Sequence, residues 1–259
     1  MSRLNQSKVD AARCIGLLGI LLVILGVSSC GSGKVTFVYP DEAMDFIPYN
    51  TKMPAIYIDT VTDMRPIEQR QGQGSFFKIT YPSDESWEVP PTQVYAEALA
   101  KDLEQTHLVE LVPLHSQADY ILSVDMLSMG CRLKRSAGSF LLTGALGAGV
   151  GYALGGDASH SAKLAVTLGI ISMVAIPVPT KNHAEAEVRM TLKDRTGNVV
   201  WQKTCLGELD SKKYMTPTSR QDQELVNEYL TKAVKKANAC LLGQLRQEFI
   251  DQSAVPSGD

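Results

Sequence analysis

The sequence AEAEVRMTLKDRTGNVVW, residues 184–201, decides the fold class that we predict for this chain. Its first ten residues alternate between a small or apolar set and a polar set. The first set is Ala184, Ala186, Val188, Met190 and Leu192, and the second is Glu185, Glu187, Arg189, Thr191 and Lys193. A period of two places successive side chains on opposite faces of a strand, so one face is expected in a core and the other in water. Residues 195–198 (RTGN) predict a turn and residues 199–201 a return strand, which together make an antiparallel hairpin.

Further strands and helices are predicted on both sides of this hairpin. Short strands are expected at residues 35–39, 55–61, 76–79, 109–113 and 120–127. A helix is expected over residues 93–106, with Thr92 as its N-cap, and a longer amphipathic helix over residues 222–250. The apolar stripe of the longer helix is Val226, Leu230, Ala233, Ala237, Leu241, Leu245 and Phe249. These elements predict an α+β fold, a small mixed or antiparallel sheet covered by helices on one face.

Composition limits the class of protein. The chain has 259 residues, of which 44% are hydrophobic and 20% charged, so it is too apolar for a disordered chain and long enough for a sizeable core. The formal net charge is −3. With no basic surplus, nucleic acid is not an expected partner.

The first 29 residues are predicted to be a signal peptide. Arg3, Lys8 and Arg13 precede an apolar segment of 13 residues, 15–27, which is too short to cross a bilayer as a stable helix. Residues 27–30 (VSSC) resemble the lipobox of bacterial lipoproteins, in which the cysteine is diacylated and becomes the first residue of the mature protein. The alternative is an ordinary signal peptide that ends beside an incidental cysteine.

Lipidation at Cys30 implies an envelope protein. Gly31 follows the cysteine where aspartate would favour the inner membrane, so a periplasm-facing protein of the outer membrane is expected. Cys131, Cys205 and Cys240 then remain in an oxidising compartment, where at most one internal disulfide can form and its pairing is open. Their spacing matches no metal site.

Motifs of catalysis are absent from the sequence. Residues 31–35 (GSGKV) imitate the end of a phosphate-binding loop, but Val35 replaces the hydroxyl residue, so residues 30–52 are interpreted as a lipidated tether with a first strand. The four histidines are scattered, and neither HExxH nor GxSxG occurs. We expect a non-enzymatic protein without cofactor, metal site or catalytic residues.

Several segments resemble known envelope proteins. Residues 118–122 (ADYIL) and 194–201 (DRTGNVVW), in this order of strands and helices, are similar to the periplasmic domain of the curli-secretion-channel lipoprotein family and to the amino-terminal domain of the Tol system's propeller protein. Asp63 and Arg65 after the first core strand are similar to a D-x-R pattern of uncharacterised envelope lipoproteins. The resemblance covers residues 53–250 and implies a fold more than a function.

Residues 132–181 depart from that family. Two apolar runs, 139–156 and 164–178, lack period-two alternation and flank a polar break at 157–161, so a helical hairpin is expected. Gly147, Gly151 and Gly155 stand four apart, a spacing that allows close helix packing as in a glycine zipper.

The hairpin has three possible environments: a membrane, a homo-oligomer, or its own domain's core. Arg132, Lys134, Arg135 and Lys181 flank both of its ends and are expected to face anionic headgroups. The predicted domains are thus residues 1–29 (signal peptide), 30–52 (tether), 53–131 with 182–250 (periplasmic α+β domain), 132–181 (hairpin) and 251–259 (disordered tail).

Two functions fit these expectations. The first is an oligomerising lipoprotein that contacts membrane lipid through Cys30 and residues 139–178 as a component of an outer-membrane export or assembly machine. The second is a monomeric periplasmic adaptor that binds a partner protein.

Overall fold

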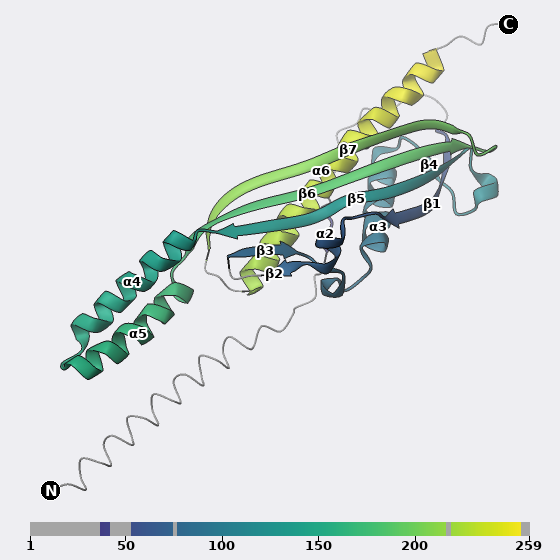
Figure 1. Ribbon diagram of the computed structural model, residues 1–259. Helices are drawn as coiled ribbons and strands as arrows, with labels where there is room; N and C mark the ends of the chain where they lie inside the picture. Colours follow the sequence, from purple (N-terminus) through teal and green to yellow (C-terminus); the bar gives the residue numbers. More distant parts are fainter. Residues whose placement is uncertain (1–36, 42–52, 75–76, 216–218, 255–259) are drawn as a thin grey trace, which may run out of the picture. The chain divides into compact units, whose positions relative to one another are not determined.

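The computed structural model describes residues 37–41, 53–74, 77–215 and 219–254 (Figure 1). Contacts divide the chain into two units, Met1–Lys34 and Val35–Asp259, and all of the described residues belong to the second. The predicted signal peptide and Cys30 lie outside the described residues.

The structure is α+β, as predicted. The strands are β1 (Ala55–Asp63), β2 (Gln73–Gly74), β3 (Lys78–Tyr81), β4 (Glu110–Leu111), β5 (Tyr120–Arg135), β6 (Val178–Asp194) and β7 (Val199–Met215). The helices are α2 (Ile67–Gln71), α3 (Pro91–Thr106), α4 (Ala137–Leu154), α5 (Ala158–Ala175) and α6 (Ser219–Ala254), with short 3-10 turns at Asp84–Ser86 and His115–Gln117.

The long antiparallel strands β5, β6 and β7 form the body of the sheet (Figure 1). β6 pairs with β5 on one side and with β7 on the other. The other edge of β5 is shared by two partners: β1 runs parallel to its first half, and β3 runs antiparallel to residues 131–134. The turn between β6 and β7 contains Gly197 at φ 88°, a left-handed conformation that suits glycine.

An irregularity in β5 explains why this strand is longer than the sequence pattern predicted. The pairing of β5 with β6 shifts between Met126 and Ser128. Before the shift Leu122 and Val124 are buried, and after it Cys131 and Leu133 are buried, so the apolar positions change from even to odd numbers. One uninterrupted period of two therefore predicts a strand that ends at residue 127.

Helices α3 and α6 cover the buried face of the sheet. The predicted stripe of α6 is buried from Val226 to Leu245. α6 approaches β7 so closely that a Cβ atom on Gly207 would lie 2.7 Å from the backbone nitrogen of Ala237. The disulfide Cys205–Cys240 joins the same two elements. It identifies which two of Cys131, Cys205 and Cys240 are paired, which the sequence left undecided. Cys131 is free and buried, and burial raises the pKa of its thiol to about 12.

A buried polar group holds the start of the described chain to both helices. Asp102 on α3 is fully buried and accepts hydrogen bonds from Tyr39, Lys235 and Asn238. The Asn238 side chain in turn accepts a 2.6 Å hydrogen bond from the Tyr95 hydroxyl. Residues 37–41 thus attach to the core through side chains. They form no strand, so the predicted strand at 35–39 is wrong for residues 37–39, and residues 35 and 36 lie outside the described residues.

Several predicted boundaries were wrong. α3 begins at Pro91 with Pro90 as its N-cap, so Thr92 lies inside the helix. Residues 132–135 and 178–181, assigned to the hairpin from sequence, belong to β5 and β6. α6 continues through residues 251–254, which were expected to be disordered.

Candidate functional site

Helices α4 and α5 form a pair inserted between two neighbouring strands of the sheet (Figure 1). The polar break begins α5, because the Asp157 carboxylate accepts hydrogen bonds of 3.0 and 2.9 Å from the backbone N–H groups of Ser159 and His160. At the other end, the Phe140 ring of α4 packs edge-on against Phe77, with ring centroids 5.5 Å apart. That contact fixes the base of α4 to the sheet beside β3.

Small residues of α4 face α5. Gly144, Gly147 and Gly151 are buried. A Cβ atom on Gly151 would lie 2.7 Å from the Cα atom of Ala165, and one on Gly147 would lie 2.6 Å from the Cβ atom of Ser172. Neither position has room for a side chain.

The predicted three-glycine zipper is not confirmed. α4 ends at Leu154, and Gly155 is the residue that terminates it, so Gly155 does not lie on a helical face with the other two. A side chain at Gly155 would instead overlap Ser161 at the start of α5.

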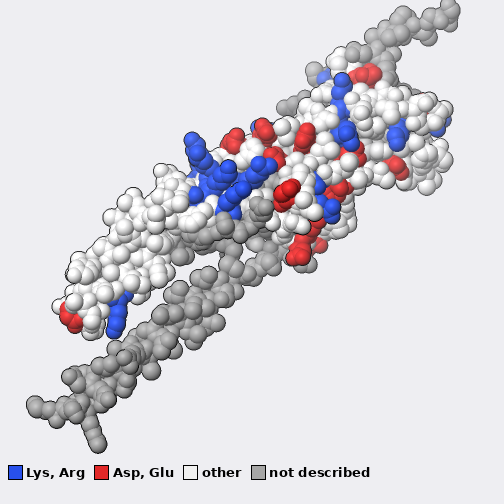
Figure 2. All heavy atoms as spheres, in the orientation of Figure 1, with Lys and Arg blue, Asp and Glu red and all other residues white. Residues whose placement is uncertain are grey.

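The outer surface of the hairpin is apolar and exposed. Leu141 is 68% exposed, Leu146 61% and Leu154 69%. Other exposed members are Leu142, Val150, Tyr152, Leu164, Val166, Ile170, Ile171 and Ile176. Figure 2 shows the hairpin surface free of charged side chains except at its far end. Exposed apolar patches of this extent mark protein or membrane contact sites.

By length and composition, α4 is the helix among the described residues that meets the requirement for a membrane span. Only 28% of it is buried, whereas the core helix of a soluble protein would be mostly buried. An 18-residue helix is about 27 Å long, close to the thickness of a bilayer's hydrocarbon core.

A row of lysines crosses the sheet at the base of the hairpin. In the strand pairing, Lys78 of β3 lies opposite Lys134 of β5, Lys134 opposite Lys181 of β6, and Lys181 opposite Lys212 of β7. All four are exposed and lie on the face of the sheet away from α6. Figure 2 shows basic side chains gathered beside the uncharged hairpin.

Lys134, Lys181 and Lys212 of this row border a hollow of about 610 Å³ that includes a second row of polar side chains. Arg132, His183 and Asp210 lie opposite one another across β5, β6 and β7. His183 contacts the carboxylates of Asp210 at 2.9 Å and Glu185 at 3.2 Å, and Arg132 donates to Glu185 at 2.9 Å. Burial disfavours the charged form of His183, but the hydrogen bonds to Asp210 and Glu185 outweigh it, so the pKa of His183 is raised.

Of the basic residues predicted to face lipid headgroups, Lys134, Lys181 and Arg132 are exposed at the hairpin's base, and their contact with headgroups stays a prediction. The sequence prediction was wrong for Arg135, whose side chain is buried on the opposite face and forms an ion pair with Asp222 of α6. It missed Lys78 and Lys212, because only the strand register aligns them with the other two.

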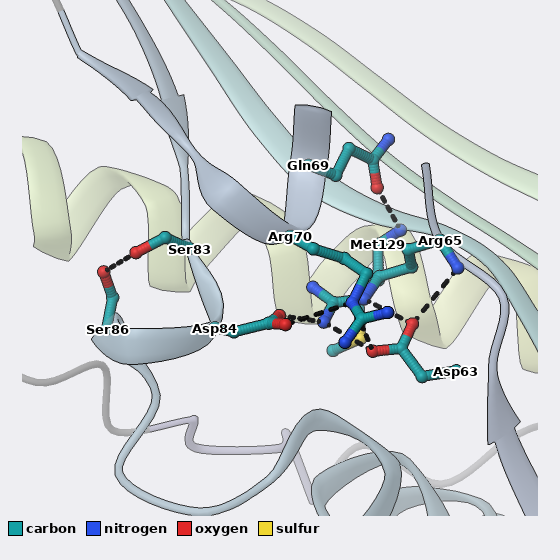
Figure 3. A network of polar contacts seen from close by, with 8 residues as sticks. All are labelled: Asp63, Arg65, Gln69, Arg70, Ser83, Asp84, Ser86 and Met129. Atoms are coloured by element: carbon teal, nitrogen blue, oxygen red, sulfur yellow. Dashed lines mark hydrogen bonds and ion pairs between the residues drawn. The ribbon is translucent and has the colours of Figure 1, made fainter. Parts of the chain in front are cut away.

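A second polar network lies where β1 leaves the sheet (Figure 3). The buried Arg65 side chain bridges Asp63 and Asp84 at 2.8 and 2.6 Å, and Arg70 also reaches Asp84. Gln69 of α2 accepts a 3.0 Å hydrogen bond from the backbone N–H of Met129. Met129 lies in β5 between the segment that pairs with β1 and the segment that pairs with β3. The D-x-R pattern therefore fastens the sheet edge, a structural role.

Among the described residues, no group of three or more His, Cys, Asp or Glu side chains is placed to hold a metal ion.

Comparisons with known proteins give distant similarities. No family model matches the chain, and no curated protein matches its sequence. Protein XCC0632 from Xanthomonas campestris, described as a DUF330 protein, is 10% identical at a TM-score of 0.41, with 85% of this chain and 94% of that one covered. A homologue of neuraminyllactose-binding hemagglutinin from Helicobacter pylori is 9% identical at a TM-score of 0.40, with coverages of 85% and 98%. The resemblance to the curli-channel and Tol groups stays a prediction.

Proposed function

We propose that this protein is a lipid-anchored outer-membrane protein, without enzymatic activity, that inserts the α4–α5 hairpin into the bilayer as part of an export or assembly machine. The observation that supports this proposal is the apolar, exposed outer surface of the hairpin combined with small residues on its inner surface. Leucine and valine side chains that face water are unfavourable, and lipid would cover them.

The arrangement suits lipid better than a water-filled periplasm. Between its two ends, the charged residues of the hairpin are Asp157 and Lys163, both near the connection between α4 and α5. Helix pairs in lipid associate through small residues, and α4 meets α5 at Gly147 and Gly151. Two attachments, an acyl-modified Cys30 and the hairpin, would together hold the protein durably, since single acyl chains bind only weakly.

Vesicle flotation of the mature chain, residues 30–259, tests this proposal when Cys30→Ala removes the anchor. We expect the protein to float with phosphatidylcholine vesicles and the variant Leu142→Glu/Leu146→Glu to remain in the soluble fraction. Leu206→Glu is the matched control, because Leu206 is an exposed leucine of β7 outside the hairpin, and it is expected to float. Equal flotation of both variants would refute insertion. A failure to float combined with a large soluble assembly would favour the hairpin as an interface between copies.

A further inference from the structure

We propose that Lys78, Lys134, Lys181 and Lys212 form a binding site for the phosphate groups of anionic lipids in the leaflet that the hairpin enters. This inference rests on the proposed function, because it assumes that the hairpin lies in a bilayer. It assigns a ligand class to the polar surface at the hairpin's base.

The strand register places the four lysines of the row side by side, so that positive charge is concentrated across the sheet. Directly opposite side chains on neighbouring strands have Cβ atoms about 5 Å apart, and like charges in such pairs are destabilising. The consecutive pairs Lys134–Lys181 and Lys181–Lys212 therefore disfavour the folded protein. Within the described part of the chain, Lys134, Lys181 and Lys212 form no ion pair that would offset this repulsion. The nearby carboxylates of Asp210 and Glu185 are engaged by His183 and Arg132.

The row lies at the level where the hairpin leaves the sheet. Lys134 is three residues before the start of α4, and Lys181 follows the end of α5 by six residues. Lys78 adjoins Phe77, whose ring packs on Phe140 of α4. With α4 and α5 in the hydrocarbon core, the ammonium groups would stand at the depth of the lipid phosphates.

The geometry favours lipid phosphates over a single soluble ligand. Four strands spaced by about 4.8 Å spread the row over about 14 Å, which suits several phosphates side by side in a membrane surface. Lysine acts on phosphate as a point charge and does not impose the paired geometry of arginine. The chain as a whole carries a formal charge of −3, so this row is a local exception to the charge of the molecule.

Vesicle binding tests the inference in the mature chain with Cys30→Ala. Vesicles of phosphatidylcholine alone are compared with vesicles that also contain phosphatidylglycerol. The protein that retains all four lysines should bind the anionic vesicles more tightly than the neutral vesicles. The variant Lys134→Gln/Lys181→Gln should bind them about 30-fold more weakly, since each lysine near an anionic surface contributes about 1 kcal/mol. Binding to neutral vesicles should not change.

The matched control is Lys193→Gln/Lys203→Gln, which removes the same charge from the sheet at its other end, on β6 and β7. It should keep most of the preference for anionic vesicles. Thermal melting should show that the Lys134→Gln/Lys181→Gln variant is at least as stable as the wild type, because like-charge contacts in the row are relieved.

The outcomes separate the two proposals. Equal wild-type binding to both vesicles, or equal losses in the two double variants, would overturn the lysine site and leave hairpin insertion standing. Absence of binding to either vesicle would overturn insertion itself. Saturable binding of inorganic phosphate without vesicles, lost in Lys134→Gln/Lys181→Gln, would contradict the lipid assignment and indicate a soluble phosphate ligand.

Discussion

At the scale of single residues, the charged side chains of this protein divide by the face of the sheet on which they lie. Lys134 and Arg135 are neighbours in β5, yet Lys134 is exposed and Arg135 is buried against α6. In sequence they form one basic segment with Arg132, and the composition of that segment cannot separate them. Only the shift in register after Met126 decides which of them reaches water.

The Arg135–Asp222 pair gives a stability prediction. Burial raises the pKa of Asp222, while Arg135 favours its charged form. Arg135→Met should leave an unpaired buried carboxylate and lower the free energy of unfolding by about 3 kcal/mol. Arg135→Met/Asp222→Leu should recover most of this loss. Urea denaturation measures the free energy of unfolding of both variants. A double variant as unstable as the single variant would show that Arg135 does not stabilise the protein through its ion pair with Asp222.

His183 gives a prediction about pH. Its pKa in the folded protein is raised above the unfolded value, so the stabilisation that it contributes is complete below about pH 6.5 and is lost as pH rises through the folded pKa. NMR titration should find the pKa of His183 elevated, and Asp210→Asn should lower it. The stability difference between wild type and His183→Gln should shrink as pH increases. A stability difference that grows with pH would contradict a raised pKa of His183 in the folded protein.

At the scale of elements, the periodic segments were predicted well and the interrupted ones were not. The alternation of residues 184–193 and the stripe of the long helix both appear as predicted, because each segment packs one face against a core along most of its length. β5 was cut short because its bulge reverses the pattern. Lys78 and Lys212 of the lysine row were missed because register between strands is a tertiary property that no single segment contains.

Close packing in the hairpin predicts different effects for two substitutions in α4. Gly151→Leu would place a side chain into the backbone of α5 at Leu164 and Ala165, so it should separate the helices and reduce membrane association. Leu146→Ala removes an exposed side chain and should have less effect. Carbonate extraction and cross-linking compare the variants. If Gly151→Leu behaves as wild type in both assays, the α4–α5 contact is not required.

The hairpin should be dispensable for folding of the sheet. β5 and β6 remain paired as far as Arg135 and Thr180, so their ends are adjacent and a short Gly/Ser loop can replace residues 137–176. The shortened protein should retain a cooperative thermal transition in circular dichroism, because the core formed by the sheet, α3 and α6 is unchanged. Loss of that transition would show that α4 and α5 belong to the core.

At the scale of the whole molecule, the chain combines an α+β part that has a polar, solvent-exposed surface with an apolar helical hairpin. The sequence alone predicted this division from the absence of period-two alternation in residues 139–178. It could not predict which surface of the hairpin is exposed, since that depends on how α4 and α5 meet. The exposed leucines and the glycines between the helices together favour a lipid environment.

The depth of the hairpin in a bilayer tests this account most directly. A cysteine introduced at Leu142 or, as control, at Leu206 can be labelled with an environment-sensitive fluorophore in the Cys30→Ala mature chain, where Cys131 is buried. With vesicles present, the label at residue 142 should shift to shorter emission wavelength and be quenched by lipids that carry a spin label in their acyl chains. The label at residue 206 should show neither effect. Unchanged emission at residue 142 in the presence of vesicles would contradict insertion of the hairpin.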